Sequence, residues 1–455
     1  MKQHIFRQYD IRGIVGEDLD ASVAEGVGRA FASHVRDASG ASAPRIAVGY
    51  DNRQTSPDLS AALSAGIRAA GGDVVDVGTV PTPVLYWSEV TLGTDAAAQI
   101  TGSHNPAEWN GIKMTVGRGS LYGDAIQGLH RRIVDADFAS GSGSYERVEV
   151  LDRYIADIAG RFALARPMKV AVDCGNGTGS LVAVELLERM GVEVSPLFCE
   201  SDGTFPNHHP DPTVDDNLED LIGKVRASPH DLGVAFDGDA DRIGAVDETG
   251  AIVRGDMLLL LLGLDLLDRR GQGQKLVFDV KCSQALPEVF AAAGGEPIMW
   301  KTGHSLQKLK MKETGAPLAG ELSGHIMVAD DYFGFDDALY VACRIIALLS
   351  RSERTLSEQI ADFPTYVSTP EIRIDVTEDE KWEIVERAVA HFKQHHDVID
   401  VDGARVQFGD GWALLRTSNT QPVIVARFEA RTEERLAEIR GEVARWLAEQ
   451  GISLP

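Results

Sequence analysis

Three stretches of the chain repeat one order of apolar and polar positions. In the first, an apolar run at 45–51 is followed by a polar turn, apolar residues at helical spacing over 59–70, two glycines, and a second apolar run at 73–77. The same order recurs over 169–197, with the single glycine Gly191, and over 275–300, again with two glycines. Short apolar runs on either side of a segment with helical spacing predict strand–helix–strand units. Such units imply parallel strands that are joined by right-handed crossovers.

Each copy leads to one more strand, and that strand ends in an unusual polar loop. The three loops are TGSHNP at 101–106, DGDADR at 237–242 and GELSGH at 320–325. Ligand sites in open α/β sheets lie outside the carboxyl ends of the strands. We therefore expect the three loops to surround a single cleft.

The last part of the chain has a different pattern. Short strand-like runs lie at 371–376, 398–401, 404–408, 412–417 and 423–430, and helical spacing lies at 378–393 and 433–450. This order predicts an α+β unit with an antiparallel sheet.

The length of 455 residues exceeds what one hydrophobic core usually serves. The expected fold class is α/β, with three similar mixed-sheet α/β domains and a C-terminal α+β domain around one central cleft. We place the four domains at 1–148, 149–251, 252–363 and 364–455, with a hinge near 362–364.

The charge balance restricts the class of partner. The chain carries 44 basic and 69 acidic residues, a net charge of −25. This charge argues against nucleic acid or an anionic membrane as a partner. The most apolar stretch, 257–267, contains Asp265 and is too short to span a bilayer, so it predicts a buried helix.

The first residues and the cysteines are typical of a cytoplasmic protein. The first residues are too polar for a signal peptide. The four cysteines have no metal-binding spacing, and we expect mostly buried, reduced thiols; they are Cys174, Cys199, Cys282 and Cys343.

The loop at 237–242 carries the strongest chemical signal. Asp237, Asp239 and Asp241 alternate, so their carboxylates project to one side of an extended or turning backbone. Oxygen ligands suit magnesium or calcium. Arg242 adds a guanidinium that suits phosphate. A metal site beside a phosphate-binding arginine indicates phosphoryl chemistry.

Two other interpretations fit parts of this loop. Clusters of Asp and Gly also form plain turns, and this loop alone leaves that interpretation open. An EF-hand begins with the same spacing, and Glu248 falls where its last ligand belongs. However, Arg242 replaces the required glycine, and the flanks at 232–236 and 243–246 read as strands. The EF-hand is therefore excluded.

Ser103 in the first loop is a candidate nucleophile or phosphate carrier, although a turn or helix-capping serine has the same local sequence. His104 is adjacent in sequence, and consecutive side chains usually diverge, so we expect no Ser–His pair. The chain also lacks a GxSxG elbow, which disfavours a serine hydrolase. The glycine-rich segment 175–179 lacks dinucleotide-binding spacing, because Ser180 stands where the third glycine belongs; a strand-to-helix turn is expected.

Two later loops offer polar groups for a sugar phosphate. Glu321 and Ser323 suit vicinal sugar hydroxyls, and His325 lies in the same loop. The segment 416–422, RTSNTQP, combines a guanidinium, hydroxyls and an amide that could grip a phosphate dianion. Each loop alone would also fit a surface turn or a polar hairpin. The four loops occur one per structural unit.

With these four loops in this order, the sequence resembles the α-D-phosphohexomutase superfamily, in its phosphomannomutase/phosphoglucomutase branch. The similarity runs from the opening FRQYDIRG to VARFEA. The resemblance implies a heart-shaped, four-domain enzyme. It would interconvert the 1- and 6-phosphates of mannose, glucose or both. Ser103 would carry the phosphoryl group, and a hexose 1,6-bisphosphate would be the intermediate and activator.

The resemblance also implies a role for each matching residue. Asp237, Asp239 and Asp241 would hold Mg²⁺ beside the phosphorylated Ser103, and Arg242 would help to hold the phosphate. Sugar hydroxyls would bind Glu321 and Ser323, with His325 nearby. The remaining candidates are Arg416, Ser418, Asn419 and Thr420 for the distal phosphate, Lys113 and His304 as acid/base or phosphate partners, and Tyr9, Arg12 and Lys281 in the cleft.

Other activities remain as alternatives. Phosphoglucosamine mutase would favour glutamine and alanine where this chain has Leu322 and Gly102. A metal-dependent sugar phosphatase and a non-catalytic sugar-phosphate-binding protein are further alternatives. The expected partner is a small phosphosugar, and the protein could be a monomer or a dimer. The sequence does not distinguish mannose from glucose.

Overall fold

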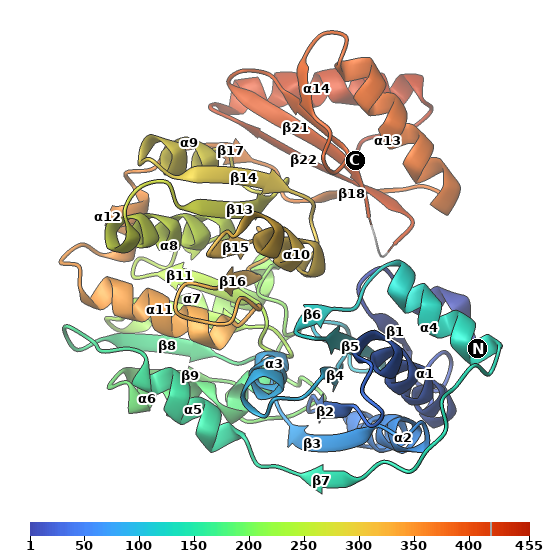
Figure 1. Cartoon of the computed structure of the whole chain (residues 1–455). Coiled ribbons are helices and arrows are strands. Elements are labelled where there is room, and N and C mark those ends of the chain that lie inside the picture. The colour runs from blue at the N-terminus through green and yellow to red at the C-terminus, as the bar shows by residue number, and fades with distance from the viewer. Residues whose placement is uncertain (419–420) are drawn as a thin grey trace. The chain divides into compact units, whose positions relative to one another are not determined.

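The structure is a computed structural model of the chain, and it describes residues 1–418 and 421–455 (Figure 1). The chain divides into two compact units, each described by itself below. Unit 1 comprises Met1–Leu258 and Ser323–Gln359. Unit 2 comprises Leu259–Leu322 and Ile360–Pro455.

The first sheet of unit 1 is mixed. Strand β2 is parallel to β3 and β4, whereas β5 is antiparallel to β1 and β4. The strand–helix–strand prediction for 45–77 is confirmed. In sheet order, the strands are β1 (Ile11–Ile14), β5 (Trp109–Val116), β4 (Ala96–Ile100), β2 (Arg45–Tyr50), β3 (Asp73–Thr79) and β7 (Tyr145–Arg147), and β6 (Gly119–Ser120) pairs with β5.

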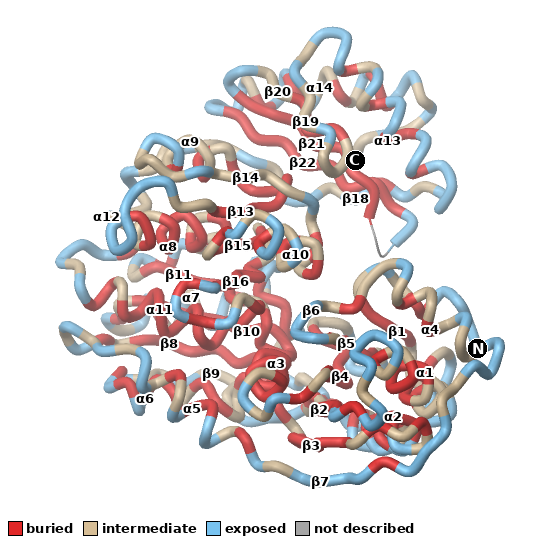
Figure 2. The backbone as a smooth tube through the Cα atoms, viewed as in Figure 1, coloured by how far each residue is buried: buried red, intermediate tan, exposed pale blue. Residues whose placement is uncertain are grey.

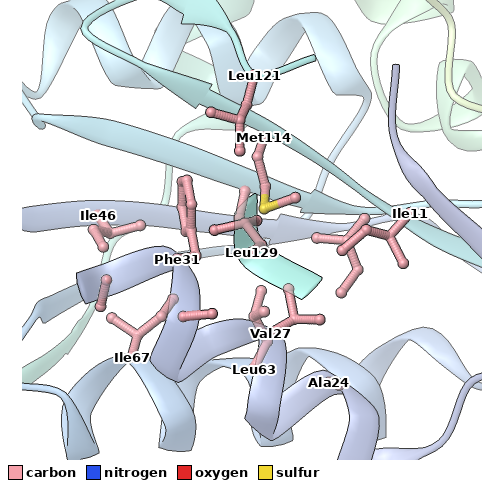
Figure 3. Close-up of a cluster of buried hydrophobic side chains, with 14 of the residues drawn as sticks. Ile11, Ala24, Val27, Phe31, Ile46, Leu63, Ile67, Met114, Leu121 and Leu129 are labelled. Atoms are coloured by element: carbon pink, nitrogen blue, oxygen red, sulfur yellow. The ribbon is translucent and has the colours of Figure 1, made fainter. Parts of the chain in front are cut away.

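Two long helices, α1 (Ala21–Ser39) and α2 (Ser56–Ala69), pack against each other beside this sheet. Glycine allows their close approach, because a Cβ on Gly28 would lie 2.2 Å from the Leu63 carbonyl oxygen. Helix α2 begins three residues earlier than the predicted 59–70, since Pro57 favours the first turn of a helix. Figure 3 shows the core between helices and sheet, where Phe31, Ile46, Leu63, Ile67 and Met114 meet. The other helices here are η1 (Gln3–Ile5), α3 (Thr82–Thr91) and α4 (Asp124–Val134).

The second sheet of unit 1 is also mixed. Strand β8 is parallel to β9 and β10, and β10 is antiparallel to β11. Strands β10 and β11 are buried along their whole length, partly because α11 packs on them. In sheet order, the strands are β12 (Ile252–Val253), β11 (Ile243–Asp247), β10 (Leu232–Phe236), β8 (Lys169–Asp173) and β9 (Glu193–Leu197).

Short helices surround the second sheet. The segment 175–179 forms the expected turn after β8 and leads into a 3₁₀ turn, η2. The helices are α5 (Leu151–Gly160), η2 (Thr178–Leu181), α6 (Ala183–Arg189), η3 (Asp215–Leu218), α7 (Glu219–Ala227) and α11 (Ala338–Ser350); strand β16 (Ile326–Val328) also belongs to unit 1.

The first part of unit 2 repeats the parallel arrangement. Strand β13 (Lys275–Asp279) lies between β14 (Glu296–Trp300) and β15 (Leu318–Gly320), parallel to both. The flanking helices are α9 (Ala285–Ala292) and α10 (His304–Thr314). Helix α8 (Gly255–Arg270) crosses the boundary between the units, and its leucines from 258 to 262 are buried, as predicted for this stretch. Helix α12 (Leu356–Ile360) also spans a boundary.

The second part of unit 2 is the predicted antiparallel sheet with two helices. Helices α13 (Glu378–Phe392) and α14 (Glu433–Glu449) pack on the sheet, with apolar faces buried and polar faces exposed (Figure 2). In sheet order, the strands are β17 (Val367–Ser368), β22 (Val423–Ala430), β21 (Gly411–Thr417), β20 (Ala404–Gln407) and β19 (Asp397–Ile399), and β18 (Ile372–Asp375) pairs with β22.

All four cysteines are free thiols, as expected. Cys174, Cys282 and Cys343 are buried, and Cys199 is half-buried. Among the described residues, no helix combines the length and the hydropathy that a membrane span requires.

Candidate active site

The carboxylate loop connects β10 to β11 in unit 1. Asp237, Asp239 and Asp241 are fully buried, and one oxygen from each lies within 4.8 Å of the others. The backbone N–H groups of Asp241 and Arg242 each donate to Asp237 Oδ1 at 3.1 Å. The flanking strands confirm that this loop is not an EF-hand.

Lys113 on β5 neutralises part of this charge. Its Nζ donates to Asp239 Oδ2 at 2.7 Å and also to Asp241 Oδ2, while Thr82 Oγ1 donates to Asp239 Oδ2 at 2.6 Å. Burial would lower the pKa of Lys113, but the two carboxylates outweigh it and raise that pKa well above its usual value. Lys113 is therefore a fixed cation at neutral pH and a poor general base.

The carboxylate oxygens of this loop that Lys113 does not contact fit a hard divalent cation. Burial and the charges of Asp241 and Asp239 raise the pKa of Asp237. Burial would raise the pKa of Asp239 as well, but Lys113 lowers it. Asp239 Oδ1 and Asp241 Oδ1 are buried and accept no hydrogen bond from any residue that the structure describes. Buried oxygens without donors are suitable ligands for such an ion.

Ser103 lies in the turn after β4, beside the carboxylates. Its Oγ donates to Asp237 Oδ2 at 3.1 Å and lies 3.1 Å from His104 Nδ1. The expectation that Ser103 and His104 form no pair is therefore wrong. Ser103 has a φ of 48°, in the left-handed region, and this bend brings the two consecutive side chains to the same side.

His104 is neutral in this setting. Burial first, and then the charges of Arg242, Arg12 and Lys113, lower the pKa of the imidazole well below its usual value. Its Nδ1 can therefore exchange a proton with the Ser103 hydroxyl.

Arg53 holds the serine loop in place and was missed from the sequence. Its side chain is inaccessible to solvent; Nη2 donates to the carbonyl oxygens of Ser103 at 2.7 Å and Asn105 at 2.6 Å. Nη1 donates to the carbonyls of Pro106 and Trp109. The available signal was a charged Asp-x-Arg directly after a buried parallel strand.

Gly102 makes room for that guanidinium. A Cβ at Gly102 would lie 2.5 Å from Arg53 Cζ. Asp51 completes the arrangement, because its Oδ2 accepts from Arg53 Nε and from the Gly102 N–H, each at 3.1 Å. The loop conformation therefore depends on these three residues together.

The glycine-rich turn after β8 supports the carboxylate loop from the other side. Thr178 donates to the Gly238 carbonyl oxygen from its N–H at 2.9 Å and its Oγ1 at 3.1 Å. A Cβ at Gly177 would lie 2.7 Å from the same oxygen, so glycine is needed there.

Other predicted residues of unit 1 lie near these loops. Arg12 on β1 bonds to Asp10 and to Asn105 of the serine loop, and Tyr9 is half-buried just before that strand. Arg242 Nε donates to His325 Nε2 at 2.9 Å. Ser323 is half-buried two residues before His325.

Unit 2 contains the other predicted residues. Glu321 follows β15 and accepts from the Gly303 N–H, directly before His304 at the start of α10. Lys281 Nζ donates to Glu371 Oε1 at 2.6 Å. This lysine lowers the pKa of Glu371 to about 2.

The last predicted loop begins at the end of β21. Arg416 Nε donates to Asp402 Oδ2 at 2.9 Å, and the Ser418 N–H donates to the Val423 carbonyl at 3.0 Å. The predicted residues Asn419 and Thr420 lie outside the described residues.

A serine beside three buried carboxylates, with a lysine and an arginine as fixed cations, defines a phosphoryl-transfer enzyme on an α/β fold. Four family models match the chain in order. Three are described as phosphoglucomutase/phosphomannomutase alpha/beta/alpha domains I, II and III, over residues 3–139, 152–250 and 254–366, and the fourth as the C-terminal domain, over 371–445. The chain belongs to the phosphoglucomutase/phosphomannomutase family, which confirms the expected family and fold class.

Relatives and solved structures agree with this family. A phosphomannomutase/phosphoglucomutase of Pseudomonas aeruginosa is 48% identical over 453 residues, which is 99% of this chain and 97% of that protein. A phosphoglucomutase of Neisseria gonorrhoeae is 43% identical, over 96% of this chain and 95% of its own length. A crystal structure of a phosphoglucomutase/phosphomannomutase family protein from Burkholderia thailandensis matches with a TM-score of 0.93 and 46% identity, covering all of both chains.

Proposed function

We propose that this enzyme interconverts hexose 1-phosphate and hexose 6-phosphate, with mannose, glucose or both as the sugar. Ser103 carries the phosphoryl group, and a hexose 1,6-bisphosphate is the intermediate. The observation that carries the proposal is the position of Ser103 Oγ, 3.1 Å from Asp237 Oδ2 at the edge of the carboxylate cluster.

The carboxylate loop and the phosphorylated Ser103 would hold Mg²⁺. The bound ion would supply charge neutralisation for the transferring phosphoryl group. Lys113 stays protonated and adds a fixed positive charge beside Asp239 and Asp241. Arg242 adds a guanidinium for the phosphate oxygens.

Transfer from the bisphosphate to Ser103 forms the Oγ–P bond, breaks the P–O bond to the sugar and releases the hydroxyl proton. Two acceptors lie 3.1 Å from Oγ, namely Asp237 Oδ2 and His104 Nδ1. The lowered pKa keeps His104 neutral but makes it a weak base, whereas the raised pKa of Asp237 makes that carboxylate the stronger base of the two. The sequence offers Lys113 and His304 as acid/base candidates. Because Lys113 stays charged at neutral pH, His304 is the better candidate for the group that exchanges a proton with the sugar.

The other residues would bind the sugar phosphate. Glu321 and Ser323 would contact hydroxyls, with His325 nearby. Arg416, Ser418, Asn419 and Thr420 would bind the distal phosphate, while Lys281, Tyr9 and Arg12 would contact other parts of the substrate. We also propose domains at 1–148, 149–251, 252–363 and 364–455, and a cytoplasmic protein that is a monomer or a dimer.

Intact-protein mass spectrometry tests the phosphoserine. After incubation with glucose 1,6-bisphosphate and Mg²⁺, we expect the protein to gain the mass of one phosphoryl group, located on Ser103 by peptide mapping. Ser103→Ala should gain none, and Ser39→Ala, at the exposed end of α1, should behave as wild type. An unphosphorylated Ser103 in the wild-type protein would contradict the mechanism.

Product analysis with glucose 1-phosphate and the Ser103→Ala variant distinguish the mutase from a phosphatase and from a binding protein. A phosphatase would release phosphate from glucose 1-phosphate without forming glucose 6-phosphate. A binding protein would keep its cellular function in Ser103→Ala. The residues at 102 and 322 differ from the alanine and glutamine expected of a phosphoglucosamine mutase, and an alanine at 102 would also place a Cβ 2.5 Å from Arg53 Cζ.

A further inference from the structure

A line of three side chains in unit 1 connects Arg242 to a buried carboxylate that has no assigned role. Arg242 Nε donates to His325 Nε2 at 2.9 Å. His325 Nδ1 lies 3.1 Å from Asp336 Oδ2 and 3.7 Å from Asp241 Oδ1. The contact with Asp336 is an ion-pair contact without hydrogen-bond geometry, so Asp336 acts on the ring through its charge. Asp336 is inaccessible to solvent, and His325 is only 4% exposed.

The arginine determines which ring nitrogen of His325 carries the proton. An arginine is always protonated, so Nε–H can only donate, and His325 Nε2 must accept with its lone pair. The ring proton of the neutral imidazole therefore lies on Nδ1, which faces Asp336. A carboxylate at Nδ1 stabilises this tautomer and fixes the orientation of the ring.

The backbone places Asp336 and His325 in this relation. Asp336 forms a backbone bridge with Met327, two residues after His325. The next residue, Asp337, caps α11 by accepting from the Tyr340 N–H. On the other side, the Ile243 N–H donates to the Gly324 carbonyl at 3.2 Å, which brings His325 beside Arg242.

Asp241, His325 and Asp336 could in principle hold a second metal ion, because their donor atoms lie within 4.8 Å of one another. However, His325 Nε2 accepts a hydrogen bond from Arg242 Nε at 2.9 Å. The ring proton therefore lies on Nδ1, the nitrogen that faces the two carboxylates, and the positive charge of Arg242 is close by. The contacts favour a chain that holds the arginine over a second metal centre.

We propose that Asp336 is a positioning residue for phosphoryl transfer. Through His325, it holds Arg242 so that the two terminal guanidinium nitrogens stay directed to the phosphate. Asp336 itself touches neither substrate nor phosphoserine. The inference rests on the proposed function, in which Arg242 binds the phosphate during transfer.

The first experiment separates kcat from KM in three variants at one fixed pH. Asp336→Ala removes the carboxylate, and we expect kcat to fall about 10- to 100-fold with KM nearly unchanged. This is the range typical of residues that orient a functional side chain without touching the substrate. Asp336→Asn keeps the shape of the side chain and an oxygen near Nδ1 but loses the charge, so its rate should lie between those of Asp336→Ala and the wild type. Asp330→Asn is the matched control, because Asp330 is a buried acid of the same segment that pairs with Arg344 instead.

A double-mutant cycle with Arg242→Lys distinguishes positioning from general stability. If Asp336 acts through Arg242, Asp336→Ala should have little further effect once the guanidinium is gone. A purely structural role would lower kcat by the same factor in both backgrounds, and that result would overturn the proposal. So would a kcat of Asp336→Ala within about twofold of wild type.

Nitrogen NMR of histidine-labelled protein gives a readout that needs no activity. The wild-type protein should show His325 as the Nδ1–H tautomer, assigned by the loss of its signals in His325→Gln. The fraction of this tautomer should fall in Asp336→Ala. An Nε2–H tautomer in the wild type would contradict the inference even if the mutase activity were confirmed. Conversely, absent mutase activity would contradict the function while leaving the tautomer measurable.

Discussion

The serine centre of unit 1 and the proposed recognition residues of unit 2 are built in different ways. In unit 1, the functional side chains bond to one another: Lys113 to Asp239 and Asp241, and Ser103 to Asp237. In unit 2, each bonds to a group outside the signature loops. Lys281 binds Glu371, Arg416 binds Asp402, and Glu321 binds a backbone N–H.

This difference has a physical consequence for substitutions. Residues that share one buried network respond together, so their effects should be large and non-additive. Residues held by separate partners should respond independently, and they should change substrate binding more than the chemical step.

The largest expected effect comes from Asp239→Asn. This change removes an oxygen that would ligate the metal and weakens the charge partner of Lys113. We expect kcat to fall about a thousandfold, as for other groups that stabilise transition-state charge, and the Mg²⁺ concentration for half-maximal rate to rise. Steady-state assays across a Mg²⁺ titration measure both.

Asp247→Asn is the matched control for that change. Asp247 is a buried acid at the end of β11, and it caps the turn at Thr249. A rise in the half-maximal Mg²⁺ concentration equal to that of Asp239→Asn would mean that the assay reports the fold and not the metal site.

The second effect concerns Arg53→Lys. A lysine keeps the charge but lacks the planar fork that reaches three carbonyl oxygens of the serine loop and the Trp109 carbonyl at the start of β5. We expect the rate of Ser103 phosphorylation by bisphosphate to fall about 100-fold with little change in KM, measured by rapid quench. Arg68→Lys, which loses one bond to the Gly143 carbonyl, should stay near wild type. Equal phosphorylation rates in Arg53→Lys and Arg68→Lys would show that the guanidinium of Arg53 is not needed to hold the serine loop.

Arg416→Ala should have a smaller effect of another kind. Losing one charge-assisted phosphate contact should raise KM for the hexose phosphate about tenfold, while bisphosphate still phosphorylates Ser103. Arg435→Ala is the control, because Arg435 is a half-buried arginine of the same unit that pairs with Asp410. Unchanged kinetics in Arg416→Ala would show that the distal phosphate binds elsewhere.

The smallest expected effect is a pH dependence of stability that comes from the Lys281–Glu371 pair in unit 2. The folded pKa of Glu371 is about 2 because Lys281 favours its charged form, whereas an unfolded glutamate titrates near its ordinary value. The pair therefore contributes stability that is complete above the unfolded pKa and is lost as pH falls toward 2. Since Glu371 is about a third exposed, we expect about 2 kcal/mol after screening by solvent.

Tryptophan fluorescence during acid unfolding measures this contribution. Wild type should be more stable than Glu371→Gln at neutral pH, and the two curves should converge at low pH. A constant difference across the whole range would show that Glu371 acts through packing and not through its charge.

The sequence predicted the strands that present the signature loops, because short apolar runs bounded by polar loops are a local signal. Contacts that depend on three-dimensional packing were not predictable in this way. The Ser103–His104 pair requires a positive φ at a serine, which composition does not reveal. Arg53 is separated from the loop it holds by 50 residues.

The contact of α11 with β10 and β11 was also not predictable from the repeats. It depends on the long-range burial of an apolar helix against strands far earlier in the chain, which a local pattern does not reveal.

The ammonium group of Lys113 has a consequence for the protein before any ion is bound. Three buried carboxylates without a counter-charge would repel one another and strain the loop between β10 and β11. Because Lys113 bonds to two of them, the polypeptide supplies its own internal cation. We therefore expect the chain to fold without a bound divalent cation. Treatment with a chelator should stop turnover and leave the melting temperature almost unchanged.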